Sequence, residues 1–231
     1  MRTKAKLVGS YFGTIYLTVI SLLQGIVLSQ LVPEFIKYHK LSKLTEDTWS
    51  NDLLLPFLLM LLIIFVVWHH YASGIFFLRW FPNIIDTIIP FIIGVFQFFL
   101  LSYLVIDTSL SDIDLKSWTQ GFALILLSGS FGYFGACWRL NPKFFIDIMR
   151  PEDAEKHVTI SKKYYARGGW SVLIQGIVAS FVFLLGREDL LWISLILIIA
   201  HIILFEYYLL RTIQPHFEKA MDAYDALRGE G

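Results

Sequence analysis

The sequence predicts an all-α, polytopic transmembrane helical bundle, and three observations support that fold class. Hydrophobic residues make up 56% of the 231 residues and charged residues 16%, whereas about a quarter of an average soluble domain is charged. Six long apolar runs alternate with charged connectors, and the positive charges sort by connector. A soluble domain of this length has too little interior to hide so much apolar surface. We therefore expect the lipid bilayer to be the main partner of this chain.

Each apolar run is about as long as a membrane-spanning helix requires. A helix needs about 20 apolar residues to cross a hydrocarbon layer of roughly 30 Å, because lipid offers no partners for unpaired backbone groups. The first run continues to Val32 without a small-residue cleavage pattern, so we expect it to be retained as a span. A six-helix domain is predicted over residues 1–213, with spans at about 8–32, 52–78, 84–106, 118–138, 170–186 and 190–211.

The second and third predicted spans are separated only by residues 79–83. Pro82 blocks helix continuation there, and Asn83 followed by Asp86 resembles the capping pair of a new helix. The sequence therefore predicts a tight hairpin. The fifth run is the shortest, and we expect its helix either to tilt less or to begin a turn earlier, through Gly168 and Gly169.

The distribution of Lys and Arg predicts the orientation, because positive residues are retained on the cytoplasmic side near span ends. Fourteen of the 19 fall in the two terminal segments and in the connectors after the second and fourth spans. Both termini are therefore predicted to be cytoplasmic, with the protein in a bacterial inner membrane. Tryptophans at the span ends form the expected aromatic belt. They are Trp80, Trp138 and Trp170 on the inner side and Trp49, Trp118 and Trp192 on the outer side.

Two short similarities suggest an internal duplication. The tetrapeptide Gln-Gly-Ile-Val occurs at 24–27 in the first span and at 175–178 in the fifth, near the bilayer midplane in both. The second and sixth spans align without a gap, which places residues 68–71 on residues 205–208. Chance recurrence is the alternative, because apolar helices share a small alphabet. A true repeat would make spans 1–2 and spans 5–6 parallel hairpins that flank a third.

Ionisable residues inside the membrane are functional candidates by default, because they are costly to place there. His69 and His70 lie about 17 residues below the outer start of the second span, and Glu206 lies equally deep in the sixth. A histidine and a carboxylate at one level can share a proton near neutral pH, which predicts a proton-responsive site. The alternative is that this level is the cytoplasmic interface, where such side chains reach the headgroups without a special role.

Four further polar residues lie nearer the midplane, namely Gln24, Gln97, Gln175 and His201. All four can form hydrogen bonds between helices, either along a permeation pathway or as packing contacts. Interhelical hydrogen bonds in membranes contribute about 0.6 kcal/mol on average, so such residues persist without any role in transport. Both interpretations stay open from the sequence.

Small residues let helix backbones approach closely in a membrane. Gly25 lies on one face of the first span, and Gly176 holds the matching place in the fifth. In the fourth span Ser128, Gly132 and Ala136 recur every four residues. We expect the fourth span to be central to the bundle or to join a homo-oligomer, and the first span is the other candidate for self-association.

The connector at 139–169 and the tail at 214–231 are expected on the cytoplasmic side. In the connector, the apolar stretch 142–149 is predicted to lie in the membrane interface, and Pro151 is predicted to begin a helix whose basic end attracts anionic headgroups. The tail is amphipathic, and its acidic face disfavours anionic lipid. We expect the tail to dock either on the connector or on a cytoplasmic partner protein.

Known catalytic signatures are missing from the sequence, which has no Walker loop, no His-Glu-x-x-His helix, no nucleophile elbow and no Asx-rich calcium loop. Neither an enzyme nor a bound cofactor is expected. Cys137 is the only cysteine, so this chain alone forms neither an intrachain disulfide nor a thiolate metal site. The formal net charge is zero and no basic groove is evident, so nucleic acid is not an expected partner.

Two functions remain compatible with these features. The first is a small oligomeric transporter or channel for an ion or small solute, with the midplane polar residues along its route and His70 with Glu206 as a proton-responsive gate at the inner mouth. The second is a membrane scaffold or sensor that does not transport anything. It would recruit a cytoplasmic partner through residues 139–169 and 214–231.

Overall fold

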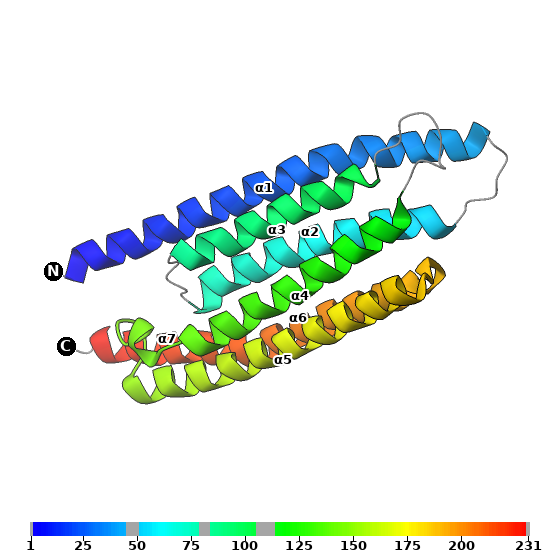
Figure 1. Ribbon diagram of the computed structural model, residues 1–231. Coiled ribbons are helices and arrows are strands. Elements are labelled where there is room, and N and C mark those ends of the chain that lie inside the picture. The colour runs from blue at the N-terminus through cyan, green and yellow to red at the C-terminus, as the bar shows by residue number, and fades with distance from the viewer. Residues whose placement is uncertain (1, 45–50, 79–83, 105–113, 230–231) are drawn as a thin grey trace.

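Long helices lie side by side in the part of the chain that the computed structural model describes, which is residues 2–44, 51–78, 84–104 and 114–229 (Figure 1). The first and last of these residues lie at the same end of the bundle. Short turns η2 (Pro142–Phe144), η3 (Glu188–Leu190) and η4 (Leu209–Ile213) join the later helices. In chain order the helices are α1 (Arg2–Leu44), α2 (Asn51–Leu78), α3 (Ile84–Ser102), α4 (Leu115–Arg139), α5 (Pro151–Leu185), α6 (Leu191–Tyr208) and α7 (Gln214–Gly229).

Side chains are described for residues 17–40, 54–75, 88, 91–104 and 114–227. The predicted tight hairpin at 79–83, which includes Trp80, Pro82 and Asn83, lies outside the described residues. So do Trp49 and the connector at 105–113.

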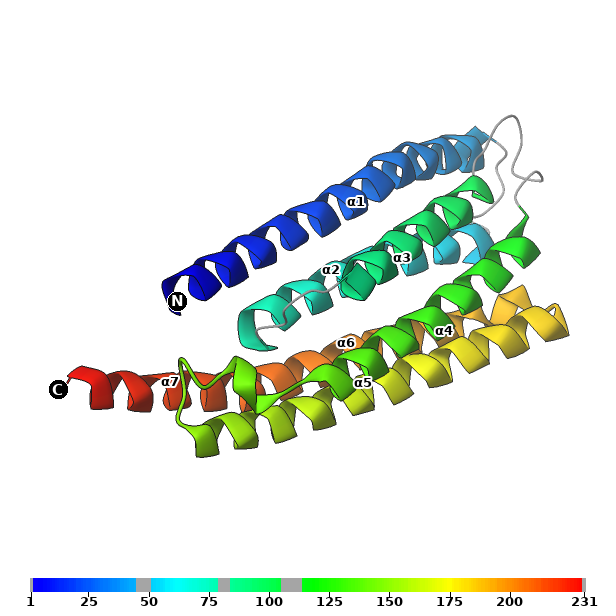
Figure 2. The same ribbon diagram turned by 60° about the vertical axis from the view of Figure 1, so that its left-hand side comes forward.

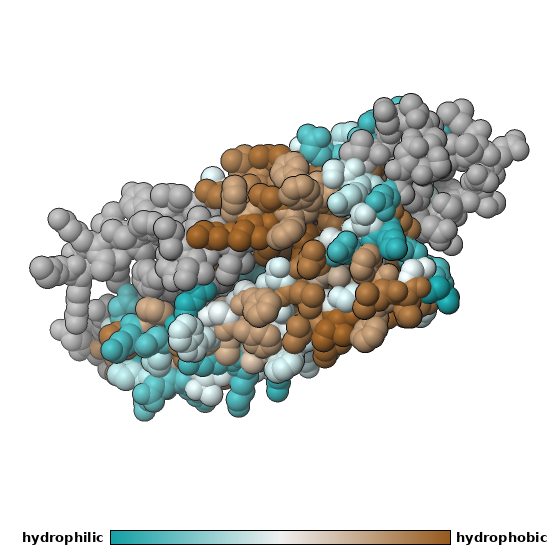
Figure 3. All heavy atoms as spheres, in the orientation of Figure 1, coloured by the Kyte–Doolittle hydropathy of each residue, from teal (hydrophilic) through white to brown (hydrophobic). Residues whose placement is uncertain are grey.

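The fold is a multi-pass bundle of apolar helices. Figure 3 shows hydrophobic residues over the middle of the molecule and hydrophilic residues toward both ends. A shorter apolar segment, Phe91–Ser102, lies in α3 at the place of the predicted third span. In the part of the chain with described side chains, five further segments are long and apolar enough to cross a bilayer, namely Leu17–Lys40, Leu54–Ile75, Leu115–Arg139, Pro151–Leu185 and Glu188–Leu227.

Large apolar side chains also point outward from the middle of the bundle. Leu22, Phe131, Leu184 and Leu204 are each more than 60% exposed. Exposed apolar surface on this scale is unfavourable in water and is the normal outer surface of a protein in lipid. The predicted class, a transmembrane helical bundle, is therefore supported both by the helix lengths and by the outer surface.

Helix α5 differs from the prediction because it is one continuous helix of 35 residues. The sequence analysis separated a connector helix from a fifth span that begins near residue 170. Pro151 occupies the first helical turn, where its missing N–H costs nothing, and the acidic residues Glu152 and Asp153 follow it there. The helix ends at Gly186, whose φ of 59° is the left-handed conformation that glycine adopts most readily.

Helices α6 and α7 form a continuous rod that contains one widened turn. The π-helical turn η4 lies between them, and the backbone N–H of Gln214 bonds to the carbonyl of Leu209. Pro215 follows directly and has no N–H with which to continue the α-helical pattern. The widened turn therefore lies at the place where the last span passes into the tail.

Helices α4 and α5 approach each other most closely, through glycines of α5. A Cβ built on Gly176 would lie 3.0 Å from the backbone nitrogen of Leu127, and one on Gly168 would overlap the Tyr133 ring. Figure 2 shows α4, α5 and α6 together on one side of the molecule and α1 on the other. The predicted central place of the fourth span agrees with this arrangement, because α4 packs on α5 and also on α3, where a Cβ on Gly121 would meet Leu100.

One member of the predicted aromatic belt is not at the surface. Trp118 is fully buried, and its ring stacks on Phe122 with 5.0 Å between ring centroids. Trp138, Trp170 and Trp192 are each at least half exposed, as a belt requires. The prediction was wrong for Trp118 because position along a helix gives depth in the bilayer but does not give the direction of the side chain.

A second apolar core, here called the end cluster, lies where α5 begins. Its buried members include Phe145, Met149, Val158, Ile213 and Ala220. The stretch 142–149 was predicted to lie in the membrane interface, but Phe145 and Met149 are fully buried in the end cluster. The tail packs here too, because the ring of Phe217 in α7 lies 5.4 Å from that of His157 in α5. Of the two docking places expected for the tail, the structure shows the connector.

Candidate functional site

Two of the four midplane residues form a pair of their own. The Nε2 of Gln24 in α1 donates to the Oε1 of Gln97 in α3 over 3.0 Å, and both side chains are buried. The other oxygen and nitrogen of this pair have no partner among the described residues. The pair joins α1 to α3 as an interhelical contact.

The other two midplane residues line a cavity inside the bundle. The cavity has a volume of about 100 Å³ and is bounded by α2, α3, α4, α5 and α6. Most of its wall is aliphatic, including Ile63, Val172 and Ile198. Gln175 and His201 belong to the wall, whereas Gln24 and Gln97 do not. The four polar residues predicted as one pathway therefore fall into two separate groups.

His201 is held at the cavity wall by two hydrogen bonds. Its Nε2 lies 3.2 Å from the hydroxyl of Tyr133 in α4, and its Nδ1 lies 3.0 Å from the Oγ of Ser171 in α5. Gln175 donates its Nε2 to the same Oγ over 3.3 Å. The His201 ring also stacks on Phe205, with 4.3 Å between centroids. Both imidazole nitrogens are thus engaged, and α4, α5 and α6 are tied together.

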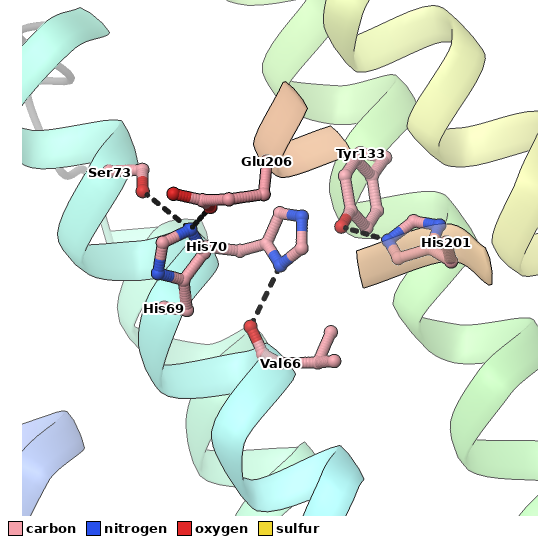
Figure 4. Close-up of polar contacts among 7 residues, drawn as sticks. All are labelled: Val66, His69, His70, Ser73, Tyr133, His201 and Glu206. Carbon is pink, nitrogen blue, oxygen red and sulfur yellow. Dashed lines mark hydrogen bonds and ion pairs between the residues drawn. The ribbon is translucent and has the colours of Figure 1, made fainter. Parts of the chain in front are cut away.

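His70 lies against this group from α2 and has one free acceptor. Its Nδ1 donates to the carbonyl of Val66 over 2.8 Å, which leaves Nε2 as the acceptor of the neutral ring. That Nε2 is buried without a hydrogen-bond partner among the described residues. The ring centroid lies 5.0 Å from that of Tyr133 and 5.4 Å from that of His201 (Figure 4).

His69 points away from the cavity and contacts the carboxylate of Glu206. Its Nε2 lies 2.7 Å from the Oε2 of Glu206 in α6, and the hydroxyl of Ser73 lies 3.3 Å from the same nitrogen (Figure 4). The side chains of His69 and Glu206 are 26% and 39% exposed. Successive residues of a helix point about 100° apart, so His69 and His70 lie on two different faces of α2. The predicted pairing of a histidine with Glu206 is present, but the partner is His69 and not His70.

The residues predicted for helix packing behave differently from one another. Gly176 makes the close approach to Leu127 described above, whereas a Cβ on Gly25 would have no described atom within 4 Å. Gly132 lines the cavity, and Ser128 is half-buried outside its wall. Gly25 therefore packs on no described part of this chain.

The sequence analysis did not single out three contributors to the site: Tyr133 as the partner of His201, Ser171 and Ser73. A signal exists for the two serines, because Ser171 precedes Gln175 by four residues and Ser73 follows His69 by four. That spacing places both members on one helix face. No comparable signal exists for Tyr133, whose contact depends on how α4 is rotated.

Among the residues with described side chains, no three His, Cys, Asp or Glu residues converge in a way that would hold a metal ion. Comparison of the chain with protein-family models, with curated proteins and with solved structures finds no match.

Proposed function

We propose that this protein is a small transporter or channel for an ion or small solute, and that the cavity beside His70 and His201 is its solute site. The single observation that carries the proposal is this cavity, which places polar side chains from four helices within an apolar wall. Ligand sites have this composition, with mostly apolar walls and a few convergent polar groups. Gln24 and Gln97 are assigned to packing and not to the route.

The His69–Glu206 pair acts as the proton-responsive element at the inner mouth. It joins α2 to α6 one residue along from His70, so a change in its strength reaches the cavity wall directly. A protonated imidazole forms a charge-assisted bond with a carboxylate, and this bond is roughly twice as strong as the neutral one. Protons therefore strengthen the contact between α2 and α6, and we expect a low inner pH to reduce permeation. The orientation in this mechanism is the predicted one, with both termini inside an inner membrane.

Flux measurements in liposomes test the proposal. The purified protein is reconstituted, proton flux is followed with trapped pyranine, and glycerol and urea fluxes are followed by light scattering. We expect at least one of these fluxes to exceed that of protein-free liposomes and to fall as the inner pH is lowered from 8 to 6. If all three fluxes equal those of protein-free liposomes, the proposal is wrong.

The variant E206Q tests the role of the ion pair. It removes the charge that a protonated His69 would pair with, so the flux should become nearly independent of inner pH between 6 and 8. E155Q is the matched control, because Glu155 lies on the exposed surface of α5, away from the cavity wall. An E206Q flux with the wild-type pH dependence would remove this pair from the mechanism.

A scaffold function is the second candidate, and the end cluster is the observation that favours it. The tail helix α7 is packed on α5 through His157 and Phe217, which gives the cytoplasmic side a shaped surface for a partner protein. A scaffold should tolerate Q175L and E206Q and should fail when residues 214–231 are deleted. Complementation of a deletion strain with these three variants separates the two functions, because a transporter should lose function in Q175L, lose only its pH dependence in E206Q, and tolerate the deletion.

A further inference from the structure

The cavity wall includes a buried hydrogen-bond acceptor without a partner among the described residues, the Nε2 of His70. The bond from Nδ1 to the Val66 carbonyl requires the proton to be on Nδ1, so the lone pair of Nε2 remains available. The atom is buried and has no partner among the described residues. Buried acceptors are nearly always satisfied in native proteins, by protein, water or ligand. A hydrogen-bond donor brought by a bound molecule would satisfy this one.

The cavity wall argues against a charged occupant. The lining residues include no Asp, Glu, Lys or Arg, and neither His69 nor Glu206 is among them. An ion buried here would lose its hydration without gaining a counter-charge. A metal cation would find only one free imidazole nitrogen, because both nitrogens of His201 are engaged by Tyr133 and Ser171.

The space inside the wall is enough for a small molecule. A dry cavity of about 150 Å³ is large enough to bind benzene, so the volume of about 100 Å³ found here accommodates a molecule of a few carbon atoms. Aliphatic side chains such as Ile63, Ile125 and Ile198 form much of the wall against which such a molecule would pack.

We infer that the cavity binds a small, uncharged hydroxyl compound that donates its hydrogen bond to the Nε2 of His70 and places its carbon atoms against the aliphatic wall. This inference rests on the proposal that the cavity is the solute site, and it narrows the solute from an ion or small solute to a neutral hydroxyl compound.

A pair of fluorinated probes tests the inference. Trifluoroethanol has the hydroxyl donor, whereas its methyl ether lacks a donor and is larger by one CH₂ group, so a preference caused by size alone would persist in the variant H70L. Binding of each to the protein in nanodiscs is followed by ¹⁹F NMR, with empty nanodiscs to correct for partition into lipid. We expect saturable binding of trifluoroethanol that is about tenfold tighter than that of the ether, the preference expected for one buried hydrogen bond. Equal affinities in the wild-type protein, or no saturable binding, would overturn the inference.

Substitution of His70 tests whether this residue causes the preference for the alcohol over the ether. H70L removes the acceptor and retains an apolar side chain, so the preference for the alcohol should disappear. Q97L is the matched control, because it also replaces a buried polar residue but lies outside the cavity wall, and it should keep the preference. If H70L keeps the preference and Q97L loses it, the alcohol binds at another site. Because the wild-type comparison stands alone, the inference remains falsifiable even if H70L does not fold.

Flux of the same purified protein in liposomes separates this inference from the proposed function. A preference for the alcohol without flux of protons, glycerol or urea would support the site and contradict transport. Flux without a preference for the alcohol would support transport and contradict the inferred ligand class.

Discussion

The same tetrapeptide, Gln-Gly-Ile-Val, occurs in α1 at 24–27 and in α5 at 175–178, and its two copies have different environments. In α5, Gly176 lies against the backbone of α4 near Leu127, whereas Gly25 in α1 faces outward with no described neighbour within reach of a Cβ. Gln175 lines the cavity and bonds to a serine of its own helix. Gln24 instead bonds across to α3.

The difference teaches that these residues take their roles from the neighbouring helix and not from their own sequence. A glycine permits close approach but does not cause it. Helix α5 carries three glycines, Gly168, Gly169 and Gly176, that each lie against α4, so the two helices are in close contact over several turns. The cavity forms beside this pair, where α2 and α6 complete the wall.

The largest expected effect on stability is the difference between substitutions at Gly176 and at Gly25. G176L should destabilise the protein by about 3 kcal/mol, because the new side chain has to displace α4, whereas G25L should change stability by less than about 0.5 kcal/mol. The single cysteine reports the change, since the thiol of Cys137 in α4 donates to the carbonyl of Lys162 in α5 over 3.4 Å. Its labelling rate during unfolding in denaturing detergent gives the stability of each variant. Equal effects at the two glycines would refute the account of α4–α5 packing.

A smaller effect is expected at the glutamine pair of α1 and α3. Q24L or Q97L alone leaves a buried amide without its partner and should cost about 1 kcal/mol, whereas the double variant should be nearly neutral, because both polar groups are then gone. The same labelling assay of Cys137 measures all three variants. Additive losses in the double variant would show that the two side chains do not act as a pair.

The smallest effect is expected at the glutamine of α5. Q175L removes a bond of 3.3 Å to Ser171 and should cost about 0.5 kcal/mol, close to the average for polar contacts in membranes. Relative to the wild-type values, Q175L should change trifluoroethanol binding more than it changes stability, because Gln175 belongs to the cavity wall. A loss of stability as great as that of Q24L would remove the contrast between the two copies of the tetrapeptide.

The pairing of His69 with Glu206 bears on the predicted duplication. These two residues occupy equivalent positions when the second and sixth spans are aligned without a gap, and they meet at 2.7 Å. Helices α2 and α6 run in the same direction (Figures 1 and 2). Equivalent residues of two parallel helices face each other when a two-fold axis along the bundle relates them. The duplication stays a prediction. A true duplication would produce a contact such as the one between His69 and Glu206.

Much of the fold could be predicted from the sequence, because apolar length and proline positions act locally. The start of α5 at Pro151 and the amphipathic tail were both expected. The continuity of α5 was not expected, because two adjacent glycines, Gly168 and Gly169, suggest a helix boundary. In the structure the rings of Tyr133 and Phe134 in α4 lie against these glycines, and the helix continues through them. The burial of Phe145 and Met149 likewise depends on α7, a distant segment.

The candidate site was predictable only in its parts. His70, Gln175 and His201 were identified by the cost of placing polar groups in lipid. Counting residues along each helix placed His201 about two turns from the level of His70, yet their ring centroids lie 5.4 Å apart. The rotation and axial shift of a helix are set by packing against its neighbours, and neither is encoded in the periodicity of that helix alone.

The most direct test of the cavity uses cysteines placed on its wall and away from it. In a C137S background, I198C lies on the cavity wall, whereas L100C lies in the buried contact between α3 and α4. A small neutral thiol reagent is applied to the protein in nanodiscs, with and without trifluoroethanol. The account predicts that I198C reacts, that trifluoroethanol slows its reaction, and that L100C stays unreactive. Equal reactivity at both positions, or no protection of I198C by the alcohol, would contradict a binding cavity within the bundle.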